Sequence, residues 1–210
     1  MLKRQATHIK KDYMNLFIGA HPDDIELGCG GIASRSNGFG YIATMESFFE
    51  MEEEKNRAWK TLGIKHLPHH YPRILQDCTH RRIDRQYLLD ELIRVREAVK
   101  PQLVFTHSST DIHQDHRVVY EETVRAFKYS SILGYTHSWN EIYPADNRFY
   151  YTLTQKDIDA KVKALKEYES QKERTYFQED FIRNSAKMTG ARINREYAES
   201  FEVIRWIEHE

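Results

Sequence analysis

The sequence "LFIGAHPDDIELGCGG" (residues 16–31) joins a short apolar segment directly to a corner rich in ionisable residues and glycine. The apolar part, residues 16–20, has the length and composition of a buried parallel strand. His21, Asp23 and Asp24 follow directly at the carboxyl end of that strand, and the glycines allow the chain to fold tightly into a helix. This stretch therefore predicts a strand–loop–helix unit with polar chemistry at its turn.

The same alternation of apolar strands and amphipathic helices continues along the chain. Further strands are predicted over residues 40–45, 102–107 and 201–206, and helices over residues 52–64, 87–101 and 158–171. Such alternation is typical of an α/β fold. We therefore expect a Rossmann-like three-layer sandwich, with a mostly parallel central sheet, helices on both faces and a single domain over residues 1–210.

A second polar corner follows the predicted strand over residues 102–107, in the sequence "SSTDIHQDHR". Ser109, Thr110 or Asp111 can cap a helix here. His113 and His116 lie three positions apart and would share one face of that helix if it has begun by then. Loops at the carboxyl ends of parallel strands converge, so the two corners should meet. Two imidazoles and a carboxylate are a normal ligand set for catalytic zinc.

Each corner alone has an ordinary structural explanation. Adjacent aspartates at a strand end are commonly a solvated turn or a helix cap, and a lone histidine is commonly a surface residue. The occurrence of both corners after strands of one sheet favours a shared metal site. The remaining histidines of the chain are expected to be loop or rim residues: His66, His69, His70, His80 and His137.

The composition excludes several kinds of partner and compartment. Lysine and arginine number 31 and aspartate and glutamate 32, so no net field attracts nucleic acid or an anionic membrane. The two cysteines, Cys29 and Cys78, form no metal-binding pattern and suit a reducing compartment. Residues 1–15 are too polar for a signal peptide, and no apolar run is long enough to form a transmembrane segment. We expect a cytoplasmic protein, and a homo-oligomer remains open.

The two corners resemble the signature motifs of a known enzyme family. "AHPDDIELGCGG" and "THSSTDIHQDHR" are similar to those of the PIG-L or LmbE-like zinc-dependent de-N-acetylases, and "KVKALKEYESQ" and "GARINREYAESFEVI" resemble later segments of the family. The resemblance therefore extends over nearly the whole chain. It implies a hydrolase that removes the acetyl group from an N-acetylated amino sugar, such as a glycoside, conjugate or sugar nucleotide, releasing acetate and a free amine.

The resemblance also implies a metal site and a general base. Zn²⁺, or Fe²⁺ or another divalent metal, would be bound by His21, Asp24 and His116. Zinc acidifies a nearby water molecule, and Asp23 would be the general base that takes the proton.

Further roles are implied for neighbouring and distant residues. His113 would be a protonated group near the scissile carbonyl or the leaving nitrogen, and Asp115 would be an orienting carboxylate that favours this charged form. Asp77, Arg192 and Tyr197 would contact the substrate. The chain departs from many relatives by having Met51 where they carry an arginine.

Three alternatives belong to other functional classes. A dinucleotide-dependent oxidoreductase would share the fold, but "GCGG" lacks a complete glycine motif and carboxylates stand where a pyrophosphate would bind. A two-metal phosphoesterase would need more bridging ligands, from "HLPHHYP" or Asp111. A non-catalytic, metal-bearing sugar-binding module would need neither Asp23 nor His113.

Overall fold

The computed structural model describes residues 14–43, 49–67, 83–145 and 148–208. These residues form a sheet of seven strands in the order β3-β2-β1-β4-β5-β7-β6. The strands are β1 (Asn15–Gly19), β2 (Phe39–Ile42), β3 (Lys65–His66), β4 (Leu103–His107), β5 (Ser131–Tyr135), β6 (Arg148–Leu153) and β7 (Tyr197–Arg205). The first five are parallel, whereas β7 pairs antiparallel with both β5 and β6. The expected mostly parallel α/β sheet is thus confirmed.

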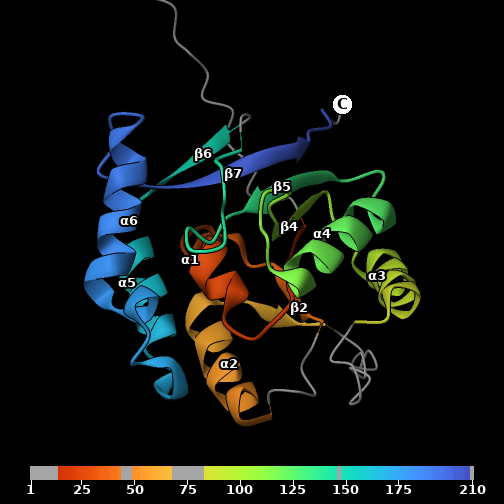
Figure 1. Cartoon of the computed structure of the whole chain (residues 1–210), viewed down its shortest axis with the longest axis horizontal. Helices are drawn as coiled ribbons and strands as arrows, with labels where there is room; N and C mark the ends of the chain where they lie inside the picture. The colour runs from red at the N-terminus through yellow and green to blue at the C-terminus, as the bar shows by residue number, and fades with distance from the viewer. Residues whose placement is uncertain (1–13, 44–48, 68–82, 146–147, 209–210) are drawn as a thin grey trace, which may run out of the picture.

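Helices cover both faces of the sheet (Figure 1). The helices are α1 (Asp24–Ser36), α2 (Phe49–Leu62), α3 (Arg85–Val99), α4 (Gln114–Ala126), α5 (Gln155–Leu165) and α6 (Glu179–Ala191), with short 3₁₀ turns η2 (Glu169–Gln171) and η3 (Thr175–Phe177). One buried apolar cluster joins the sheet to α1, α2, α5 and α6, and the other joins it to α3 and α4. No helix in the described part of the chain has the length and apolar character needed to cross a bilayer.

The strand residues alternate between these two clusters, which is why the sheet is apolar on both faces. In β1, Phe17 packs in the cluster with α1, while Leu16 and Ile18 pack in the cluster with α3, and all three are fully buried. Burying each such side chain contributes about 1.5–3 kcal/mol. A continuous apolar run is therefore the expected signature of a strand in this position.

The sequence did not reveal several elements. β3, β5, β6 and α6 were not predicted, and the helix expected over residues 158–171 begins earlier and ends at Leu165. The helix predicted after the second polar corner begins only at Gln114, with His113 as its N-cap, so Ser109, Thr110 and Asp111 do not cap it. The glycines of the first corner lie inside α1 rather than in a loop before it.

Helix α1 contains a kink that a buried ion pair stabilises. Cys29 has a non-helical backbone, with φ −144° and ψ 23°. The carboxylate of Glu199 accepts hydrogen bonds from the N–H groups of Gly31 and Ile32, at 2.8 and 2.9 Å. Lys161 donates to the carbonyl of residue 27 and to Glu199, both at 2.8 Å. The pair thus satisfies backbone groups on both sides of the kink and supports the first turn of α1.

Glycine at position 31 permits the close approach of Glu199 and Leu153 to α1. A Cβ atom there would lie 2.6 Å from Cδ1 of Leu153 and 2.9 Å from Oε1 of Glu199. Both distances are shorter than van der Waals contact. The "GCGG" sequence therefore serves close packing of α1 against β6 and β7.

We predict that Glu199→Gln lowers the free energy of unfolding by about 3–5 kcal/mol, because it leaves the buried ammonium of Lys161 without a counter-charge. Urea denaturation followed by circular dichroism measures the change. The matched control is Asp159→Asn, which removes one carboxylate from an exposed ion pair with Arg183 and should leave stability nearly unchanged, because solvent screens such a pair. Equal losses of stability in the two variants would contradict the stabilising role assigned to the buried Lys161–Glu199 pair.

Candidate functional site

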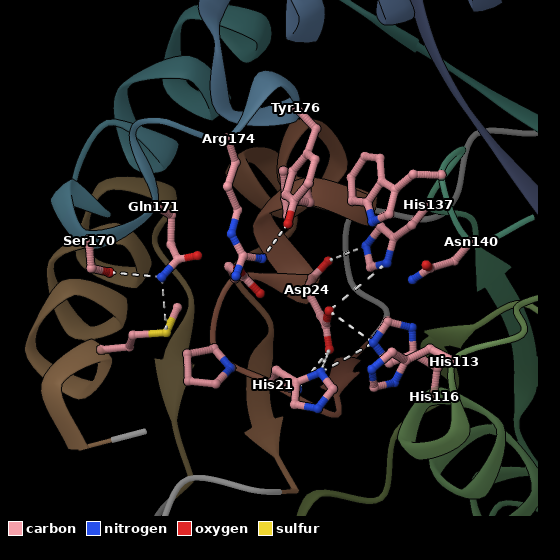
Figure 2. A pocket seen from close by; sticks show the side chains of 15 residues that line it. His21, Asp24, His113, His116, His137, Asn140, Ser170, Gln171, Arg174 and Tyr176 are labelled. Carbon is pink, nitrogen blue, oxygen red and sulfur yellow. Dashed lines mark hydrogen bonds and ion pairs between the residues drawn. The ribbon is translucent and has the colours of Figure 1, made fainter. Parts of the chain in front are cut away.

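The two polar corners lie where the strand order reverses direction in the sheet. β1 and β4 are adjacent and parallel, but the helices that follow them, α1 and α4, pack on opposite faces. The connections therefore diverge and leave a crevice at the carboxyl ends of the strands, which is the usual ligand position in such sheets. His21, Asp24 and His116 meet in this crevice (Figure 2).

These three side chains have the spacing of ligands around one metal ion. His116 Nε2 lies 3.2 Å from His21 Nδ1 and 3.4 Å from Asp24 Oδ1, and His21 Nδ1 lies 3.5 Å from Asp24 Oδ2. Bonds of 2.0–2.1 Å in a tetrahedral site place ligand atoms about 3.3 Å apart. The three residues therefore fit a divalent ion with an open coordination position.

Hydrogen bonds to neighbouring groups fix each of these side chains. Asp24 Oδ2 accepts from the backbone N–H groups of Ala20 and His21, at 3.0 and 2.7 Å. Asp115 Oδ2 lies 3.0 Å from His21 Nε2, and Asp111 Oδ2 lies 2.8 Å from His116 Nδ1. These contacts leave His21 Nδ1 and His116 Nε2 directed at the shared centre. A carboxylate on the remote ring nitrogen is the usual partner of a metal-binding histidine.

Asp115 acts on two histidines. Its carboxylate lies 3.0 Å from His21 Nε2, and its charge also favours the protonated form of His113, as the sequence interpretation expects, although burial and the neighbouring histidines outweigh it. Asp111, which was considered only as a cap or a bridging ligand, holds His116 and also accepts from the backbone N–H of His113 at 2.9 Å. Both aspartates thus act on the histidines of the centre.

The same carboxylates keep protons on the imidazoles in the metal-free protein. Burial works to lower the pKa of His21, but hydrogen bonds and charge from Asp115 and Asp24 outweigh it and raise that pKa to about 10. For His116, burial is again opposed by Asp24 and Asp111, and the pKa rises to about 9. Asp24, surrounded by imidazoles, has a pKa well below its ordinary value despite its burial. The centre thus holds cations in the metal-free state.

Asp23 lies beside the centre and lines the cavity. Its backbone has φ 96°, in the left-handed region, at the N-cap of α1, yet its side chain makes no capping hydrogen bond. Burial, followed by the charge of Asp24, raises the pKa of the Asp23 carboxyl well above its ordinary value. The side chain is thus a buried carboxyl with an increased affinity for a proton.

His113 also lines the cavity, with its ring 5.0 Å from that of His21 and 4.4 Å from that of His116. Burial and then the positive charges of His116 and His21 lower the pKa of His113. This direction differs from the protonated form that the family resemblance implies. A neutral ring at this position retains one N–H that can donate to a ligand.

The cavity has a volume of about 750 Å³ and includes residues that sequence reasoning did not identify. His137, expected to be a loop or rim residue, is 2% exposed, and its Nε2 lies 3.3 Å from the backbone oxygen of Asp24. Its ring stacks on Trp139, which stacks in turn on Tyr176 at 4.0 Å. The run "SILGYTH" repeats the strand-then-histidine pattern of "LVFTH", and recognising β5 would have placed His137 at this edge.

The structure does not bring the predicted substrate-binding residues to the described cavity. Arg192 is exposed at the C-cap of α6. Tyr197 is buried in the core, and its hydroxyl donates to Gln155 Oε1 at 3.1 Å. Asp77 lies outside the described residues. Neither Arg192 nor Tyr197 is among the residues that line the cavity.

Known proteins share this fold and sequence. The chain matches the family described as PIG-L, GlcNAc-PI de-N-acetylase, over residues 41–127. It is 30% identical over 171 residues to the uncharacterized deacetylase YaiS of Escherichia coli strain K12, covering 74% of this chain and 90% of that protein. The chain belongs to the PIG-L family of deacetylases.

Solved structures with the same fold include enzymes of different activities. N,N'-diacetylchitobiose deacetylase from Pyrococcus horikoshii has a TM-score of 0.64 at 18% identity, over 92% of this chain and 85% of that one. GalB, the 4-carboxy-2-hydroxymuconate hydratase from Pseudomonas putida KT2440, has a TM-score of 0.73 at 16% identity, over 94% and 98%. Activity must therefore be argued from the site, not from the fold.

We predict that binding of Zn²⁺ releases up to two protons at neutral pH. In the metal-free protein the pKa values of His21 and His116 are about 10 and about 9, and a metal needs the lone pairs that these protons occupy. The affinity should therefore rise as the pH rises toward 9, by up to about 100-fold per unit if both protons leave. Calorimetric titration in buffers of different protonation enthalpy counts the protons. Zn²⁺ binding by the wild type without proton release would contradict the assignment.

Proposed function

We propose that this chain is a divalent-metal-dependent N-deacetylase, with zinc as the expected metal and an N-acetylated amino sugar as substrate. The observation that carries the proposal is the close approach of His21 Nδ1, His116 Nε2 and the two carboxylate oxygens of Asp24, at 3.2–3.5 Å, with the carboxyl group of Asp23 beside them. A metal held by three protein ligands retains a position for water or substrate.

An ion in this position would supply Lewis acidity, which polarises an amide carbonyl and makes a neighbouring water molecule more acidic. Asp23 takes the proton of the attacking water. Because its pKa is raised by burial and by Asp24, the resulting carboxylic acid can pass the proton to the departing nitrogen. The attack forms the new C–O bond, and the C–N bond then breaks to give acetate and an amine. Such acid–base assistance typically accelerates a reaction about 10²–10⁴-fold.

His113 stabilises the oxygen of the acetyl group as negative charge develops on it. The neutral ring, favoured by burial and by the neighbouring cations, donates one N–H to this oxygen. Its Nδ1 is buried and has no hydrogen-bond partner among the described residues. The effect of one such donor is about 10²–10³ in turnover.

The cavity supports an amino sugar as the substrate class. Its volume of about 750 Å³ suits a ligand of one or two sugar rings. Trp139 and Tyr176 line one wall; because Trp139 is stacked between His137 and Tyr176, a sugar would contact the edges of these rings, which supply apolar surface. The P. horikoshii relative is a deacetylase of an acetylated chitobiose, which agrees with this class.

The alternatives gain less support from the site. In a two-metal phosphoesterase Asp111 would serve as a bridging ligand, but its Oδ2 is engaged by His116 Nδ1 at 2.8 Å. The other candidate segment, "HLPHHYP", lies mostly outside the described residues. A sugar-binding module without turnover would have no use for a strained, buried Asp23 beside the metal ligands.

We predict that the purified protein releases acetate from at least one member of a panel of N-acetylhexosamines, their glycosides and sugar nucleotides. Activity should disappear after chelation and return when Zn²⁺ or Fe²⁺ is added, because the proposed reaction needs Lewis acidity. Acetate is measured enzymatically and the free amine by a fluorogenic reagent, in equal amounts. Unchanged acetate release in chelator would contradict the metal requirement.

We further predict different failures of Asp23→Ala and His116→Ala. Asp23→Ala should retain the metal and lose about 10²–10⁴ in turnover, because only the proton acceptor is removed. His116→Ala should lose the metal itself, because it removes a ligand. Metal analysis of both purified variants, with circular dichroism to verify folding, tests this division. Equal loss of metal in the two variants would refute it.

A further inference from the structure

The cavity carries a basic side chain on the wall formed by η2, η3 and the residues between them. Arg174 is the one lysine or arginine among the described residues that line the cavity. Figure 2 shows its guanidinium extending inward beside Tyr176, on the side away from His113 and His116. The centre itself needs no such cation, because its ligands are already held by hydrogen bonds.

The backbone that carries Arg174 is anchored to the core. The hydroxyl of Tyr168, which is 1% exposed, donates to Glu26 Oε1 at 2.7 Å. The backbone N–H and the hydroxyl of Ser170 both donate to Glu54 of α2, at 3.0 and 2.6 Å. The N–H of Arg174 then donates to the carbonyl of Gln171 at 3.0 Å. The segment therefore has a defined position at the cavity wall.

The guanidinium, in contrast, retains unused donors. Within the described residues, its side-chain hydrogen bond goes from Nη1 to the hydroxyl of Tyr176, and the guanidinium also lies over that ring at 5.8 Å. Within the described part of the chain it forms no ion pair with a carboxylate, whereas Arg57, Arg85 and Arg183 each pair with at least one. The phenol is neutral, so this hydrogen bond does not compensate the charge, which acts at longer range on the Asp23 carboxyl. Nε and NH2 can therefore serve a ligand in the cavity.

We propose that Arg174 is an anion-binding subsite, so that the preferred substrate is an N-acetylated amino sugar bearing a phosphate or carboxylate group. This proposal rests on the proposed deacetylase function and refines its substrate class. The planar guanidinium offers parallel N–H donors that match two oxygens of a phosphate or carboxylate. The acetamide would reach the metal ligands while the anionic group lies at the wall that carries Arg174. The sugar ring between them would contact the edges of Tyr176 and Trp139, whose rings stack on each other.

The test compares matched substrates with and without charge. N-acetylglucosamine is assayed beside its 6-phosphate, its 1-phosphate and its uronic acid at low ionic strength, since salt screens an exposed charge. The wild type should prefer at least one anionic member by about 10-fold or more in kcat/KM, the range of a charge-assisted contact. Arg174→Gln should remove this preference, by raising KM for the anionic sugars more than for the neutral sugar. Arg174→Lys should retain part of it. The phosphate and uronic acid arms identify which anion is used.

The matched control is Arg195→Gln, which removes an exposed arginine that does not line the cavity and should alter none of these values. Arg174 also acts electrostatically on Asp23. An equal loss of kcat for neutral and anionic sugars in Arg174→Gln would assign it to the reaction and overturn the subsite. Absence of any anionic preference in the wild type would overturn it too, while leaving deacetylation intact.

A binding measurement separates failure of the subsite from failure of the enzyme. Calorimetric titration with glucosamine and glucosamine 6-phosphate needs no turnover. Tighter binding of the phosphate by the wild type, lost in Arg174→Gln and kept in Arg195→Gln, supports the subsite even if no acetate is released. Equal binding of the two amines, together with equal turnover of the two N-acetyl sugars, contradicts it.

Discussion

The carboxylate of Asp24 is fixed by two backbone N–H groups at the end of β1, and the geometry of the metal centre depends on it. Those N–H groups, from Ala20 and His21, hold Oδ2 at 3.0 and 2.7 Å. The following helix, α1, is held by the Lys161–Glu199 pair, which bonds the carbonyl of residue 27 and the N–H of Gly31. The first corner is thus rigid, and His116 reaches it from a helix on the other face of the sheet. A site assembled in this way is preorganised for an ion.

The charges of the site explain why a metal suits it better than protons do. Two imidazoles with pKa values of about 10 and about 9 lie within 3.2 Å of each other. Two such cations repel each other, and the surrounding carboxylates of Asp24, Asp111 and Asp115 stabilise the doubly protonated state. A divalent ion supplies the same charge from one point and satisfies all inward lone pairs at once. Asp23, in contrast, stays outside this arrangement because its φ of 96° turns it away from the capping position, at a backbone cost of about 1–3 kcal/mol.

The sequence could predict the meeting of the two corners because parallel strands must deliver their loops to one edge. The choice of His21, Asp24 and His116 among the polar residues of the corners rests on the family resemblance. The start of α4 could not be predicted, because "SSTDIH" contains several residues that can cap a helix. In the structure Asp111 instead contacts His116, and the helix begins at Gln114. His137 was missed because β5, with Ser131 and Gly134, is a less apolar run than β4, and Arg174 because η2 and η3 have no periodic pattern. The glycines of α1 were placed in a loop because their reason, close packing on Leu153 and Glu199, is tertiary.

The division between a rigid centre and a variable wall accounts for one fold carrying different activities. The ligands of the centre come from β1, α1 and α4, which the sheet positions. The rest of the cavity comes from residues 137–140 and 170–176, which lie in loops and 3₁₀ turns. Met51 of α2 is 8% exposed, and its sulfur lies 3.7 Å from the amide nitrogen of Gln171. Among the described residues that line the cavity, Arg174 is the one lysine or arginine, and it lies outside the strands and helices that carry the candidate metal ligands. Since loops tolerate sequence change far better than the sheet, the chemistry at the strand ends can remain constant while this wall determines which molecule is brought to it.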